Sequence, residues 1–197
     1  MPPSRGPRRA KLRDGSVVRV RAVRPADKAL LRAAFDRLSE QSRYRRFFVP
    51  MRELTDRALA YLTEVDHHDH EALLALSEAG DEVLGVARYV RAGKDAQDAE
   101  AAITVVDDWQ GRGLGRLLLR RLARRAREEG IRRFTALVKV ENPAAVELLR
   151  GLGPSELTRD GSEFRLVIEL PARGVGTKLA RALRAAAAGL VSDSRKF

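Results

Sequence analysis

The sequence predicts one α/β domain in which a mixed central sheet is flanked by helices. Two observations favour this class. Short apolar runs bounded by turn residues occur together with longer runs of helical period. One apolar run also leads through a glycine-rich loop directly into a helix-period run. The chain has 197 residues, of which 44% are apolar. This length and composition suit a single core of ordinary size.

The first half of the chain is expected to begin with a tail and to continue with mixed elements. Residues 1–14 are rich in proline, glycine and arginine without periodicity, so we expect a basic disordered tail there. Apolar alternation predicts three strands, at 16–22, 71–77 and 82–90. The last two are joined by Ala79-Gly80-Asp81, which is typical of a hairpin. Helical spacing and start signals predict three helical segments, at 25–38, 39–48 and 55–65.

The second half is expected to complete the domain, which we place at residues 15–171. Further strands are predicted at 101–106, 133–140 and 164–170. One helix should follow Gly113 and end at Gly130, and another should start at Asn142-Pro143. Residues 172–197 are alanine-rich and basic, and we expect a C-terminal helix or tail whose role the sequence does not indicate.

A glycine loop is the most informative local feature. Residues 111–115 contain three glycines immediately before the helix-period run. Glycine allows a backbone to approach a ligand closely and to adopt positive φ. The first turn of a helix also presents N–H groups without internal partners and a partial positive charge. The loop therefore predicts a phosphate or pyrophosphate site. A tight strand-to-helix turn without any ligand is the alternative.

Two familiar phosphate loops do not fit this sequence. The dinucleotide fingerprint needs Gly-x-Gly-x-x-Gly and an acidic residue about 20 positions later. Here the spacing is Gly-x-Gly-x-Gly, and basic residues follow the next turn. The nucleoside-triphosphate loop ends in Gly-Lys-Ser/Thr. Here Gly115 is followed by Arg116 and Leu117.

The pattern Gln110-x-x-Gly113-x-Gly115 resembles the Gln/Arg-x-x-Gly-x-Gly/Ala signature of the GNAT N-acetyltransferases. Glu100 at the start of the preceding strand and the segment 138–145 are similar to other family positions. The segments 39–48 and 65–70 look like the bacterial protein-lysine acetyltransferase branch. The resemblance covers roughly residues 15–170, and the loop is its most specific part.

The resemblance implies a GNAT fold with a mostly antiparallel sheet of six to seven strands and two central parallel strands that splay apart. It also implies acetyl-CoA as co-substrate. The cofactor-binding residues that it implies are Ile103, Thr104, Val105, Gln110, Gly111, Arg112, Gly113, Leu114, Gly115, Arg116, Asn142 and Arg150.

Acetyl transfer to an amine needs a base, because a lysine amine with a pKa near 10.4 is protonated at neutral pH. The resemblance assigns this role to Glu100, whose pKa we expect burial among apolar neighbours to raise. A salt-bridged structural Glu100 is the alternative. The N–H of Val105 can polarise the thioester carbonyl. Many family members carry a tyrosine as general acid where this chain has Leu149, so we expect that group to be absent.

The acceptor implied by the resemblance is a protein lysine, with an acyl-CoA synthetase as one candidate partner. Three alternatives stay open. They are acetylation of a small amine, polyamine or antibiotic; a non-catalytic acetyl-CoA sensor; and a nucleic-acid binder. The net charge of +11 favours the last, but aromatic residues are only 5% of the chain, so stacking platforms are scarce. Specific nucleic-acid binding is therefore not expected, and the oligomeric state is not predicted.

Composition also indicates the setting. The chain has no cysteine, no apolar run near 20 residues and no secretory signal pattern, so we expect a cytoplasmic protein. No metal site is predicted. The cluster His67, His68 and His70 lacks the spacing of a zinc site, and a polar loop is expected. A role beside the acceptor cleft is the second interpretation, and metal binding is the third.

Overall fold

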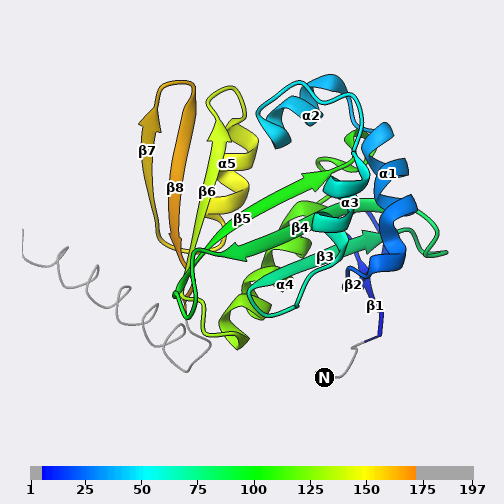
Figure 1. Ribbon diagram of the computed structural model, residues 1–197, viewed down its shortest axis with the longest axis horizontal. Coiled ribbons are helices and arrows are strands. Elements are labelled where there is room, and N and C mark those ends of the chain that lie inside the picture. Colours follow the sequence, from blue (N-terminus) through cyan, green and yellow to red (C-terminus); the bar gives the residue numbers. More distant parts are fainter. Residues whose placement is uncertain (1–5, 172–197) are drawn as a thin grey trace, which may run out of the picture.

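The computed structural model describes residues 6–171, and their centre is one twisted eight-stranded sheet (Figure 1). Its strand order is β1-β2-β3-β4-β5-β6-β8-β7. All neighbouring strands are antiparallel except β5 and β6, which are parallel. The strands are β1 (Arg8–Lys11), β2 (Val17–Ala22), β3 (His70–Leu76), β4 (Val83–Arg91), β5 (Asp98–Val105), β6 (Arg133–Lys139), β7 (Ser155–Asp160) and β8 (Glu163–Glu169).

Helices cover both faces of this sheet. In Figure 1, α1 and α3 lie in front of the strands, α2 lies above the upper end of β5, and α4 lies behind the sheet. The helices are α1 (Lys28–Asp36), α2 (Glu40–Phe47), α3 (Asp56–Thr63), α4 (Leu114–Glu128) and α5 (Pro143–Arg150). Two short 3-10 turns, η1 (Pro25–Asp27) and η2 (Asp107–Trp109), precede α1 and α4. No helix of the described range combines the length and apolarity that a membrane crossing requires.

The sheet separates two apolar layers because successive side chains of a strand point to opposite faces. Strand β3 shows this most clearly, since it is buried on both faces. Its residues Leu74 and Leu76 pack with α1 and α3 in one cluster, whereas Leu73 and Ala75 pack with α4 in the other. Each face of the sheet therefore has its own apolar layer, and these layers hold the helices against both faces.

The two central strands separate after a short paired stretch. Parallel pairing joins Asp98 with Arg133, Ala99 with Phe134 and Glu100 with Thr135, and no later pair is found. On its other edge β5 stays paired with β4 as far as Val105. Backbone groups of β5 that point toward β6 beyond Glu100 consequently lack a sheet partner there. The predicted splay of the central parallel strands is thus confirmed.

The predicted strands and helices within residues 15–171 are all found, with ends shifted by a few residues. Two strands were not predicted, so the sheet has eight strands rather than six to seven. The predicted disordered tail is wrong for residues 8–11, because these form β1 and pair with β2. Strand β7 pairs only with β8, and its polar sequence gave no apolar alternation. The predicted C-terminal helix lies outside the described residues.

The pairing of β1 with the sheet leads to a prediction about stability that would not follow from a disordered tail. Leu12 directly follows β1, is 8% exposed and packs in the α4-side core, whereas Arg13 is exposed. We expect Leu12→Ala to lower the free energy of unfolding by about 2–4 kcal/mol, because it leaves a cavity. Arg13→Ala is the matched control and should change it by less than about 0.5 kcal/mol. Equal effects in urea unfolding would contradict the docking of this segment.

Candidate functional site

The glycine loop between η2 and α4 is shaped by backbone conformation. Gly111 and Gly113 have φ of 74° and 88°, and a Cβ added at either position would meet nothing within 4 Å. Left-handed conformation, rather than crowding, is what requires glycine there. Gly115 differs, because its Cβ would lie 2.9 Å from Cδ2 of Leu148 in α5. Gly113 is the N-cap of α4 and leaves the first N–H groups of the helix without a side-chain cap.

Asp107 ties this loop to α2 across the chain. Its carboxylate accepts hydrogen bonds from the Ser39 N–H at 2.8 Å and from the Ser42 hydroxyl at 2.6 Å. Burial acts to raise the pKa of Asp107, but these hydrogen bonds outweigh it and hold the pKa below its ordinary value. Gln110 donates from Nε2 to the Val105 carbonyl at 3.1 Å. The loop, the end of β5 and α2 are therefore held in one arrangement.

A pocket opens where β5 and β6 separate, and we call it the splay pocket. Most of the predicted cofactor-binding residues line it, namely Ile103, Thr104, Val105, Gln110, Gly111, Gly113, Gly115, Arg116 and Asn142. Sequence reasoning missed further lining residues, including Ser42, Arg45, Arg46, Trp109 and Leu148. The arginines come from α2, and no local motif connects that helix with the glycine loop. The pocket brings together the loop, the free edge of β5 and the start of α5.

Three predicted binding residues do not line the splay pocket. The Leu114 side chain is fully buried in the core, so only its backbone can face the loop. Arg112 is exposed, and its guanidinium lies over the Trp109 ring at 4.8 Å from the ring centroid. Arg150 is exposed at the end of α5. None of these three side chains lines the splay pocket, although Arg112 contacts a residue that does, namely Trp109.

Glu100 lies at the fork of the two central strands. It is the last residue of β5 that pairs with β6, and it shares a sheet face with Ala102 and Thr104. Its side chain is exposed, so the expected burial among apolar neighbours is not found. Glu100 also forms no salt bridge within the described range. The negative charge of Glu100 nevertheless acts on Arg46. It opposes the lowering of the Arg46 pKa that burial causes.

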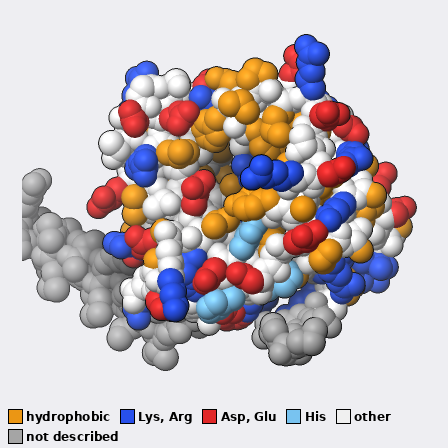
Figure 2. Space-filling view, viewed as in Figure 1, with side chains coloured by type: hydrophobic (Ala, Val, Ile, Leu, Met, Phe, Trp, Pro, Cys, Tyr) orange, Lys and Arg blue, Asp and Glu red, His pale blue; other side chains and the backbone are white. Residues whose placement is uncertain are grey.

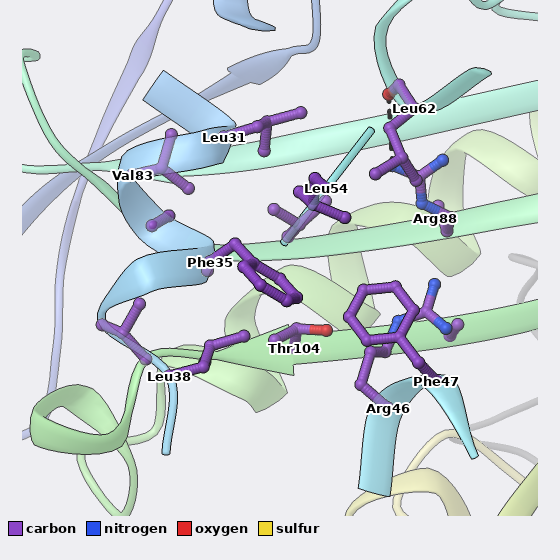
Figure 3. Close-up of a pocket in the computed structure, with 15 residues that line it drawn as sticks. Leu31, Phe35, Leu38, Arg46, Phe47, Leu54, Leu62, Val83, Arg88 and Thr104 are labelled. Atoms are coloured by element: carbon purple, nitrogen blue, oxygen red, sulfur yellow. Dashed lines mark hydrogen bonds between the residues drawn. The ribbon is translucent and has the colours of Figure 1, made fainter. Parts of the chain in front are cut away.

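A second pocket lies on the same face, between the sheet and α1 to α3, and we call it the apolar pocket (Figure 3). One end is aliphatic and aromatic, with Leu31, Phe35, Leu38, Leu54, Val83 and Val106. At the other end, Figure 3 shows the side chains of Arg46 and Arg88 near Phe47. Arg46 and Thr104 line both pockets. The two pockets therefore meet at these residues, beside the splay.

Arg88 in β4 is the most buried cation of this region, with 6% exposure. Its Nη1 contacts Nε2 of His70 at 3.1 Å, and its Nη2 donates to the Leu62 carbonyl at 3.2 Å. Burial and the nearby charge of Arg46 lower the pKa of Arg88 to about 9. Because a guanidinium only donates, the ring nitrogen of His70 must be the acceptor. Burial and Arg88 lower the pKa of His70 to about 4, which keeps the imidazole neutral.

The other histidines of the cluster lie in a polar network. Nδ1 of His67 is 2.8 Å from Glu71, and Nδ1 of His68 is 2.6 Å from Glu129. No group of three potential metal ligands is present in the part of the chain that the structure describes. The predicted polar loop accounts for His67 and His68. His70 instead accepts a hydrogen bond from Arg88, which lines the apolar pocket.

Leu149 is 3% exposed, so it packs into the core and supplies no proton donor. A tyrosine nevertheless lies near the apolar pocket. Tyr61 in α3 is 58% exposed, and its ring centroid is 5.0 Å from that of His70. No motif near the glycine loop signals this residue, because only the fold brings α3 to the pocket.

Comparison with known proteins shows which family and which relatives this chain is similar to. Residues 31–153 match the model of the acetyltransferase (GNAT) family. Acetyltransferase Pat of Mycolicibacterium smegmatis is 34% identical over 161 residues, which are 82% of this chain and 48% of that protein. The chain thus spans about half the length of this relative.

Solved structures agree with the sequence relatives. The crystal structure of the GNAT domain of S. lividans PAT superimposes with a TM-score of 0.79 at 32% identity, covering 86% of this chain and all of that one. The structure of yncA from Salmonella typhimurium was solved with its cofactor acetyl-CoA. It shares the fold at 21% identity and a TM-score of 0.63, covering 80% of this chain and 96% of that one. The chain is therefore a member of the GNAT family of acetyltransferases.

Proposed function

We propose that this chain transfers the acetyl group of acetyl-CoA to a primary amine, with Glu100 as general base. The observation that carries the proposal is the meeting of two pockets beside the splay of β5 and β6. One pocket is lined by the glycine loop and the free strand edge. The other is enclosed by α1 to α3 and suits a different molecule. Transfer between two substrates needs such a junction.

The cofactor is proposed to lie in the splay pocket. The N–H groups of the first turn of α4 and the Arg116 guanidinium would bind the pyrophosphate. The pantetheine amides would pair with the free edge of β5 at 103–105, as an added strand does. The Val105 N–H would then polarise the thioester carbonyl. Asn142 is less free than expected, because its Oδ1 already caps α5 by accepting from the Ala145 N–H.

The exposed position of Glu100 suits a base that acts through water. The acceptor ammonium must lose a proton before it attacks, and an exposed carboxylate can accept that proton directly or through one water molecule. No general acid is assigned, since a coenzyme A thiolate leaves readily without protonation.

A protein lysine is the acceptor that the sequence resemblance implies, and a protein partner such as an acyl-CoA synthetase fits that role. Exposed apolar side chains around α2 and α3 support it, namely Tyr44, Val49 and Tyr61. Figure 2 shows hydrophobic atoms gathered on the face that carries α2, a setting that suits contact with a protein surface. The cysteine-free composition is consistent with a reducing compartment such as the cytoplasm.

A small amine is the second acceptor class, and the lining of the apolar pocket favours it. The pocket is apolar at one end and carries two arginines at the other. A polyamine or a cationic antibiotic would meet these charges without any carboxylate in the lining. Among small amines, the lining therefore favours those without further positive charge.

Replacement of Glu100 tests the proposed base. We expect Glu100→Gln to lower kcat by at least about 100-fold, because the amide cannot accept the proton. Acetyl-CoA affinity, measured by calorimetry, should stay within about twofold, since Glu100 does not line the splay pocket. Glu156→Gln, an exposed carboxylate on β7, is the control and should leave both values unchanged. Unaltered turnover in the Glu100 variant would remove this residue from the mechanism.

Replacement of Gly113 tests the anion site. Gly113→Ala places a Cβ at a φ of 88° and should lower the free energy of unfolding by about 1–2 kcal/mol. Gly130→Ala is a matched control, because Gly130 has a φ of 80° and open space at the opposite end of α4. Both variants should lose similar stability, but only Gly113→Ala should weaken acetyl-CoA binding. Equal affinities in the two variants would refute phosphate binding by this loop.

A further inference from the structure

The two arginines of the apolar pocket have no acidic partner. Arg88 is 6% exposed and Arg46 is half-buried on α2. Neither guanidinium forms a salt bridge with any carboxylate of residues 6–171. The hydrogen bonds of Arg88 go to a neutral imidazole and a backbone carbonyl, and Arg46 only approaches the Phe47 ring, at 5.1 Å from its centroid. Neither positive charge is therefore in contact with a carboxylate, and Glu100 acts on Arg46 only from a distance.

Such a pair is unfavourable unless an anion joins it. Buried charges in proteins are normally paired, because removing a charge from water is costly. Here two like charges also lie at one end of the same pocket, close enough for Arg46 to lower the pKa of Arg88. Glu100 does not serve as the counter-ion, since it is exposed and lies outside the lining. Arginine forks also match a carboxylate geometrically.

We propose that Arg46 and Arg88 hold the carboxylate of the acceptor, and that the acceptor is a free α-amino acid with an apolar side chain. This rests on the proposed function and names its substrate class. The apolar side chain would fill the end of the pocket formed by Leu31, Phe35, Leu38, Leu54, Val83 and Val106. An α-amino acid carries its amine one carbon from the carboxylate, so a carboxylate held at the arginines keeps the amine near the junction of the pockets.

The junction defines where the amine acts. Arg46 lines both pockets, and Glu100 is close enough to affect its pKa. A carboxylate on Arg46 therefore brings the neighbouring amine between Glu100 and the splay pocket. The amine nitrogen attacks the thioester carbon, a C–N bond forms and the C–S bond breaks. The amine proton passes to Glu100, and coenzyme A leaves as the thiolate. The carboxylate is unchanged, and the product is an N-acetyl amino acid.

This acceptor differs measurably from a protein lysine. A lysine side chain reaches the junction with an amine alone and leaves both arginines without an anion. An amino acid amide has the same amine and side chain as the free acid but lacks the negative charge. The pair L-methionine and L-methioninamide therefore isolates the contribution of the carboxylate. A lysine-containing peptide with blocked ends represents the other acceptor class.

The test measures coenzyme A release by the full chain with these three acceptors. We expect kcat/KM for L-methionine to exceed that for L-methioninamide by at least about 100-fold. Arg88→Gln keeps a donor for the Leu62 carbonyl but removes the charge. It should raise KM for L-methionine at least about tenfold and leave the value for the amide within about twofold. Arg88→Lys, which retains a charge, should lie between wild type and Arg88→Gln.

Two controls make the result specific. Arg165→Gln removes an exposed charge on β8, away from both pockets, and should change neither acceptor. Acetyl-CoA affinity of the Arg88 variants should match that of the wild type, because Arg88 does not line the splay pocket. If Arg88→Gln fails to fold, the comparison of acid and amide on the wild-type protein decides alone.

Three outcomes would overturn the inference. The amide could be acetylated as well as the acid, the Arg88 variant could impair both equally, or only the lysine peptide could react. In each of these cases coenzyme A is still released, so the proposed acetyltransferase activity stands without the amino acid acceptor. Absence of coenzyme A release with every amine, together with no acetyl-CoA binding, would instead refute the proposed function itself.

Discussion

The structure depends on one constraint, which is that the parallel pairing of β5 with β6 ends at Glu100. Up to that residue the sheet is continuous, and beyond it β5 stays with β4 while β6 continues with β8. A sheet that divides in this way leaves backbone groups unpaired along an inner edge, which is rare in a core. The divergence also opens the splay pocket, and it places Glu100 at the fork. The free edge of β5, the splay pocket and the candidate base thus have one structural origin.

The acceptor side is coupled to this fork through α2. Asp107, beside the glycine loop, accepts hydrogen bonds from Ser39 and Ser42 at the start of α2. The same helix carries Arg46, which lines both pockets. Residues that would bind the cofactor therefore also position a residue that would bind the acceptor. A displacement of α2 would alter both pockets, so α2 is the element that would align the two proposed substrates.

How much the sequence could predict follows from the range of each interaction. The glycine loop depends on local interactions. Gly113 needs a positive φ at the start of a helix, and this requirement can be recognised from one short segment of sequence. Strand β1 was missed because Arg8 and Arg9 form an exposed edge, whose composition is that of a tail. In the sequence, Arg88 is a single charged residue within an apolar strand. Only the packing of α2 and α3 on the sheet shows that Arg88 shares a pocket with Arg46. Glu100 was expected to be buried, but the open fork leaves it exposed.

The central claim is that the free edge of β5 and the first turn of α4 bind the co-substrate together. Residue-resolved amide hydrogen exchange, measured with and without coenzyme A, tests this directly, because exchange slows where a backbone N–H gains a partner or is covered. The account predicts slower exchange at Val105 and across the loop and first turn at 111–116, with little change in β7. Unchanged exchange at both places under saturating coenzyme A would contradict it.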